Sequence, residues 1–224
     1  MIHTVKYLIL LVCLMLAPAA HAQEATDTTA ATTLARLVAA YEGVTTLSAD
    51  FVQTSRFAGF STVKTFAGHL ELIRPDRMRW DYRQGSEQQI FLSERQVTVF
   101  APVSNQAIVT TLTPASDRQI PLHLLADVTG IENTYQIAAG KEPGELQLTP
   151  LETLAGAPQN IHLWLHPDSG LIAKVQLNLA GGSSSELVFD SFDRSSAIPA
   201  ERFVFDAPEG VYVVHPASIF PAAR

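Results

Sequence analysis

Apolar positions along the chain follow two different periods. Leu34, Leu37, Val38 and Tyr41 recur at intervals of three and four residues, which places them on one face of a helix that Gly43 is suited to end. After Gly43, apolar and polar residues alternate in short runs bounded by turn residues, as in half-buried strands. This pattern predicts about eleven strands, near residues 48–56, 63–73, 77–83, 87–93, 96–101, 105–110, 134–139, 145–150, 160–166, 171–180 and 184–193.

Short turns connect many of these runs. Arg74-Pro75-Asp76, residues 167–170 and Gly181-Gly182-Ser183 have the composition of tight turns. Strands joined this closely pair antiparallel. The strands do not alternate with helices, which excludes a parallel nucleotide-binding sheet. We therefore expect residues 34–214 to form one mainly β domain.

One apolar segment interrupts the strands between residues 113 and 130. It contains Ile120-Pro121-Leu122-His123-Leu124-Leu125-Ala126, and Pro121 suits the first turn of a helix. The segment could be a lid or plug on an open sheet, or a packed connecting turn. Periodicity does not decide between these two interpretations.

The first residues have the order of a secretory signal peptide. Lys6 precedes an apolar run over residues 7–16, Pro18 breaks the run, and Ala20-His21-Ala22 supplies small residues for cleavage after Ala22. The run is shorter than the ~20 residues that span a bilayer. We therefore expect residues 1–22 to be removed on export to the periplasm, and the Thr- and Ala-rich residues 23–33 to form a mobile leader.

Composition limits the partners and the chemistry of the mature chain. Removing Lys6 with the signal leaves 14 Lys and Arg against 22 Asp and Glu, so the net charge changes from −7 to −8. Positive charge is not clustered, which argues against nucleic acid and against stable docking on anionic lipid. The single cysteine, Cys13, lies in the signal, so the fold cannot depend on disulfides.

Motifs for catalysis are missing from the sequence. It contains neither a Gly-x-Ser-x-Gly elbow nor a Gly-x-x-x-x-Gly-Lys phosphate loop. His162 and His166 fall on a predicted strand, where residues four apart are about 13 Å from each other. That distance is too long for one zinc ion. The sequence therefore predicts a protein that is not an enzyme, with no catalytic residue, metal or cofactor.

The hairpin around residues 66–82 has one apolar and one polar face. Large apolar side chains alternate with charged ones, so that the apolar set shares one side of both strands. This side could receive acyl chains, or it could be an ordinary core, and the alternation alone favours the core. The apolar set comprises Phe66, Leu70, Leu72, Met78, Trp80 and Tyr82, and the polar set comprises Arg77, Arg79 and Asp81.

Arg74 stands at the end of the first strand of this hairpin, before a proline. Its planar guanidinium could donate to several carbonyl oxygens of a neighbouring segment. An exposed turn arginine is an equal alternative.

At this hairpin the chain resembles the LolA family, the periplasmic carriers of outer-membrane lipoproteins. The matching motifs run in order through nearly the whole mature chain. They are Phe51-Val52-Gln53, Gly68-His69-Leu70, Arg74-Pro75 with Trp80-Asp81-Tyr82, residues 97–106 ending in Gln106, residues 121–125, residues 198–205, and Pro208-Glu209-Gly210-Val211.

The resemblance implies an incomplete antiparallel β-barrel covered by a few α-helices that form a lid. It implies that Arg74 hydrogen-bonds the lid backbone and gates the cavity with Leu122, Leu124 and Leu125. A monomer would take acylated lipoproteins from an inner-membrane ABC-type release complex and pass them to an outer-membrane receptor. The acyl chains would lie in a cavity lined by Phe66, Leu70, Leu72, Met78 and Trp80.

Two departures from the family pattern stand out. The tail, residues 215–224, is short and Pro-containing, so we expect it to be disordered and without an additional C-terminal strand. His123 lies in a lid segment that is otherwise apolar in the family. A related half-barrel carrier or sensor of another acylated ligand, such as a glycolipid or a mislocalised lipoprotein, remains the alternative function.

Overall fold

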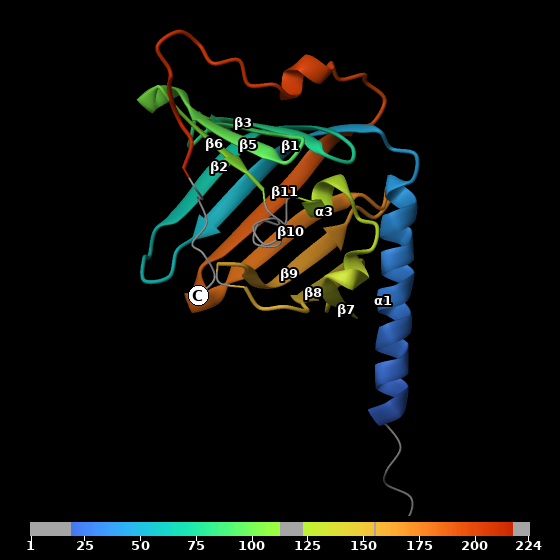
Figure 1. Cartoon of the computed structure of the whole chain (residues 1–224). Helices are drawn as coiled ribbons and strands as arrows, with labels where there is room; N and C mark the ends of the chain where they lie inside the picture. Colours follow the sequence, from blue (N-terminus) through green and yellow to red (C-terminus); the bar gives the residue numbers. More distant parts are fainter. Residues whose placement is uncertain (1–18, 113–122, 155, 217–224) are drawn as a thin grey trace, which may run out of the picture.

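A computed structural model describes residues 19–112, 123–154 and 156–216 of the chain (Figure 1). These residues form two α-helices, α1 (Ala19–Tyr41) and α3 (His123–Ala126), and four short 3₁₀ turns, η1 (Pro102–Ser104), η2 (Ile131–Asn133), η3 (Ala180–Gly182) and η4 (Ala200–Phe203). The strands are β1 (Thr46–Arg56), β2 (Val63–Ile73), β3 (Arg77–Gln84), β4 (Gln89–Ser93), β5 (Gln96–Ala101), β6 (Gln106–Thr111), β7 (Tyr135–Ala139), β8 (Glu145–Pro150), β9 (Pro158–Leu165), β10 (Ile172–Leu179), β11 (Ser184–Asp193) and β12 (Tyr212–Val214).

All twelve described strands belong to one sheet, in the order β12-β6-β5-β4-β3-β2-β1-β11-β10-β9-β8-β7. Neighbouring strands pair antiparallel, except that β12 lies parallel to β6. The sheet ends at β12 and β7 and is not closed, which confirms the predicted incomplete antiparallel barrel. Each of the eleven predicted strands is present, with bounds that differ by two residues at most.

The curved sheet has two differently covered faces (Figure 1). Its inner face packs against α1 and α3, and its outer face is crossed by the chain that follows β11. Alternation along β1 shows the division, because Leu47, Ala49 and Phe51 are buried inward while Ser48 and Asp50 are only partly buried. The main hydrophobic core therefore lies between the inner face and the two helices.

Helix α1 begins earlier than the sequence predicted. Residues 23–33, expected as a mobile leader, lie within it. The segment contains three alanines and no Gly or Pro to interrupt a helix. Ala30 and Thr33 are buried at the spacing that leads to Leu37 and Tyr41. The buried stripe thus continues toward the N-terminus through Ala30 and Thr33. Because these residues are small or polar, a search for large apolar residues does not detect them.

The segment after β11 returns across the outer face and supplies the strand that the sequence did not predict. Phe203 is buried, and Phe205 lies 5.5 Å from Phe91 and 5.1 Å from Phe100 between ring centroids. The chain then adds β12 to the edge of β6. This strand ends at Val214, just before the tail of residues 215–224, and it is not among the eleven predicted strands, because three residues paired to a strand far back in the sequence leave no hairpin signal. The end of the tail, residues 217–224, lies outside the described residues.

Candidate functional site

Four of the five residues predicted to line a cavity lie together on the inner face. Leu70 is the cross-strand partner of Trp80, and Leu72 is the partner of Met78. All four are at most 3% exposed. Phe66 is half-buried further along the same face, with its ring centroid 6.1 Å from that of Tyr82. The structure thus has these side chains packed in the core, and their role in binding stays a prediction.

Aromatic side chains from other strands complete this part of the face. The ring centroid of Phe51 on β1 lies 5.0 Å from those of both Trp80 and Tyr82. That of Phe189 on β11 lies 6.1 Å from Trp80. Phe51 and Phe189 were not among the predicted cavity residues. Only the pairing of β1 with both β2 and β11 brings them next to the hairpin.

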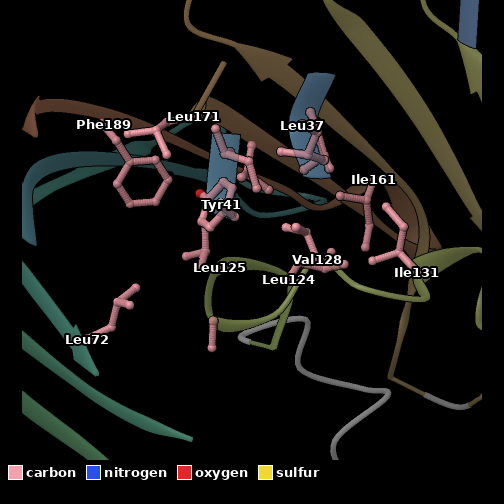
Figure 2. Close-up of a cluster of buried hydrophobic side chains, with 14 of the residues drawn as sticks. Leu37, Tyr41, Leu72, Leu124, Leu125, Val128, Ile131, Ile161, Leu171 and Phe189 are labelled. Atoms are coloured by element: carbon pink, nitrogen blue, oxygen red, sulfur yellow. The ribbon is translucent and has the colours of Figure 1, made fainter. Parts of the chain in front are cut away.

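The lid lies over the inner face of the sheet and packs against α1 (Figure 1). Leu124, Leu125 and Ala126 of α3 are buried, and Figure 2 shows Leu124 and Leu125 gathered with Leu37 and Tyr41 of α1. The segment predicted as a lid or a connecting turn is therefore helical over 123–126 and covers the core. Leu122, the remaining predicted lid residue, lies outside the described residues.

Arg74 joins three segments that are distant in the sequence. Its Nε donates to the Ala126 carbonyl at the end of α3, at 2.5 Å. Its Nη1 donates to the carbonyls of Tyr41, the last residue of α1, at 2.5 Å, and of Val44, three residues further on, at 3.2 Å. Its Nη2 lies 3.6 Å from Asp127 Oδ1. One cation thus supplies donors to carbonyls at and just after the C-terminal ends of two helices, where backbone N–H partners are fewer.

The side chain of Arg74 is only 17% exposed, so it is not the exposed turn arginine of the alternative interpretation. The guanidinium also lies over the ring of Tyr41, 5.4 Å from its centroid. Burial raises the pKa of Tyr41 to about 12, although a hydrogen bond with the Ile172 backbone and the charge of Arg74 lower it in part. Tyr41 is therefore neutral at physiological pH and packs as part of the core beneath the lid.

The two histidines considered as metal ligands have separate partners. His162 Nδ1 lies 2.7 Å from Glu145 Oε1, whereas His166 Nδ1 accepts from N–H groups of its own turn. Burial would raise the pKa of Glu145, but hydrogen bonds from His162 and from two backbone N–H groups together lower it. Within the described ranges, no three His, Cys, Asp or Glu side chains are placed to hold a metal ion.

The helices in the described part of the chain do not combine the length and hydropathy that crossing a membrane requires.

A model of the family described as outer membrane lipoprotein carrier protein LolA matches residues 42–206.

Several known proteins are similar to this chain. An outer-membrane lipoprotein carrier protein of Chromobacterium violaceum is 29% identical over 193 residues, which cover 82% of this chain and 88% of the relative. A protein of the same name from Pseudomonas fluorescens is 27% identical over 181 residues, with 81% and 87% covered. The crystal structure of an uncharacterized conserved protein from Thermus thermophilus superposes with a TM-score of 0.52 at 12% identity. That match covers 84% of this chain and 99% of the other, and it shows a shared fold.

Proposed function

The chain belongs to the LolA family of outer membrane lipoprotein carrier proteins, and we propose that it carries lipoproteins through the periplasm by sheltering their acyl chains. In this proposal, cargo comes from an inner-membrane ABC-type release complex and goes to an outer-membrane receptor. The relatives named above support the choice of cargo, since both are described as lipoprotein carriers.

The observation that carries the proposal is an apolar inner face covered by a helical lid that Arg74 ties to the sheet and to α1. Leu72 and Met78 have no exposed surface in this closed state. In this proposal, α3 moves away from the sheet when cargo enters. Arg74 is a polar connection between the lid and both β2 and α1.

The magnitudes are compatible with reversible opening. A hydrogen bond from a charged donor contributes about 1.5–3 kcal/mol, so the bond from Arg74 to the Ala126 carbonyl holds the lid by about that much. A buried methylene contributes about 0.8 kcal/mol, so one chain of about fifteen methylenes gains on the order of 12 kcal/mol. The burial of a single acyl chain therefore outweighs the polar contact that Arg74 makes with the lid, and the closed state returns when cargo leaves.

A reconstituted release assay tests the proposal. Inner-membrane vesicles that contain the release complex and a labelled lipoprotein are given ATP with the mature protein, with buffer, or with an unrelated periplasmic protein. We expect labelled lipoprotein in the supernatant, bound to the protein, only in the first reaction. Release no greater than with buffer would exclude a general lipoprotein carrier and favour another acylated ligand.

A further inference from the structure

Trp80 carries a polar atom that the core leaves without a partner. Its indole lies on the inner face of β3, between its cross-strand neighbours Leu70 and Ile90. The residue is 3% exposed, and Nε1 is buried with no hydrogen-bond partner among the residues that the structure describes. A buried indole N–H usually finds an acceptor, and leaving it unpaired costs stability.

The neighbouring aromatic residue with a polar group does not share this defect. Tyr82 donates from its hydroxyl to Gln53 Oε1 at 2.7 Å. Gln53 in turn donates to Ser55 and Ser185. The same aromatic cluster therefore contains one donor with a partner, the Tyr82 hydroxyl, and one donor without, the Trp80 indole N–H.

The surroundings of Trp80 restrict the acceptor that could satisfy it. Its ring neighbours are Phe51 and Phe189, and its cross-strand neighbours are aliphatic. A charged group would lose its hydration there without compensation. Indole Nε1–H is a donor only, so the acceptor must be a neutral oxygen carried by an otherwise apolar molecule. An acyl chain fits this description, because it joins an apolar chain to a carbonyl oxygen.

We propose that Trp80 is a specificity-determining residue, whose indole N–H donates a hydrogen bond to the ester carbonyl of a bound acyl chain. This inference rests on the proposed function and adds to it. The inner face then distinguishes acyl chains from alkyl chains of equal length, and does not bind them by apolar contact alone. In the empty closed state the same donor stays unpaired, which favours loading.

The test compares two lipopeptides that differ only in how their two chains are joined to glycerol. One carries ester linkages, and the other carries ether linkages with chains of the same length. Affinities for the mature wild-type protein are measured by titration calorimetry. We expect the ester form to bind about fivefold to tenfold more tightly, the effect of one neutral hydrogen bond of about 1–1.4 kcal/mol.

Two variants assign the preference to the indole N–H. Trp80→Phe keeps an aromatic ring but has no donor, so the ester preference should fall to about one while ether binding is retained. Trp164→Phe is the matched control, because Trp164 also has an unpaired buried Nε1 but lies on the outer face of β9 under Lys174. This variant should keep the full preference.

In the Trp164→Phe protein, Trp80 is the remaining tryptophan and reports directly on its own environment. Its fluorescence should shift to longer wavelength with the ester lipopeptide and not with the ether form. Equal affinity of the wild-type protein for the two lipopeptides would overturn the inference and leave the carrier proposal intact. Failure to bind either lipopeptide would overturn both. The wild-type comparison does not depend on whether Trp80→Phe folds.

Discussion

At the scale of single residues, Arg74 has polar partners on two segments that are distant from it in the sequence. Its side chain is the polar link between the end of β2, the end of α1 and the end of the lid. The bonds exist in the closed state, so they favour the empty form over the loaded one. This makes Arg74 a candidate for returning the carrier to its closed state when cargo leaves.

Replacing Arg74 with Leu should therefore slow hand-off of cargo while the protein stays folded. Loss of the closed-state bonds should shift the open-to-closed equilibrium by about 10- to 100-fold, or about 1.4–2.8 kcal/mol. Amide hydrogen exchange at Leu124 to Ala126 and lipoprotein transfer to the receptor measure the two effects. Arg83→Leu, at an exposed position of β3, controls for the lost charge. Transfer at the wild-type rate by Arg74→Leu would remove this residue from the mechanism.

Gly68 shows a close approach that a side chain would prevent. A Cβ at this position would collide with the Asp81 carbonyl oxygen and come within 2.8 Å of the Phe51 ring. Gly68→Ala should therefore destabilise the protein by about 1–3 kcal/mol through overpacking. Urea denaturation measures the free energy of unfolding. A decrease below about 0.5 kcal/mol is within the usual range of surface substitutions. It would show that β2 and β3 can move apart here without strain.

At the scale of elements, the chain after β11 acts as a strap on the outer face. Arg202 donates to Glu71 on β2 at 2.7 Å, and Arg79 on β3 donates to the Arg202 carbonyl at 3.0 Å. The rings of Phe205, Phe91 and Phe100 continue the contact toward β12. The strap therefore connects strands on one half of the sheet from the side opposite the lid.

Phe205→Ala should loosen this strap before it affects the rest of the sheet. We expect a loss of about 1–2 kcal/mol from the two ring contacts and the buried area. Hydrogen exchange at Tyr212 to Val214 should rise more than exchange in β8 or β9. Val204→Ala is the control, because Val204 is 63% exposed. Uniform changes across the whole sheet would contradict a locally acting strap.

At the scale of the whole molecule, an open sheet must be closed by other elements. Helices α1 and α3 cover its inner face, and the core that they share with the sheet includes two tyrosines that differ from ordinary surface tyrosines. Burial raises the pKa of Tyr82 to about 12, as it does for Tyr41. Both hydroxyls thus stay protonated in the folded protein at a pH where the unfolded chain ionises.

Stability should therefore fall at alkaline pH. The two buried tyrosines contribute to the free energy of unfolding in full below pH 10. This contribution is lost as the pH rises from about 10, the ordinary tyrosine pKa, through about 12, the pKa in the folded protein. The expected loss is on the order of 1–3 kcal/mol per tyrosine. Urea midpoints at pH 8, 10 and 11.5 measure it. Tyr82→Phe should flatten the curve, and Tyr212→Phe, at a position 70% exposed, should leave it unchanged.

The sequence by itself determined the elements of this protein. Alternation and turn residues located eleven strands, because which face of a strand is buried depends on residues next to each other along the chain. The same local information assigned Leu70, Leu72, Met78 and Trp80 to one face. It could not locate β12 or the start of α1, where a short parallel pairing and small buried residues leave little apolar pattern.

Only the tertiary structure decided how these elements meet. The aromatic ring contacts around Trp80 join strands that the chain separates by more than a hundred residues, from Phe51 to Phe189. The three carbonyls that Arg74 reaches belong to segments on either side of it in the sequence. The unpaired Trp80 N–H is likewise a property of packing, because whether a donor has a partner depends on every element around it.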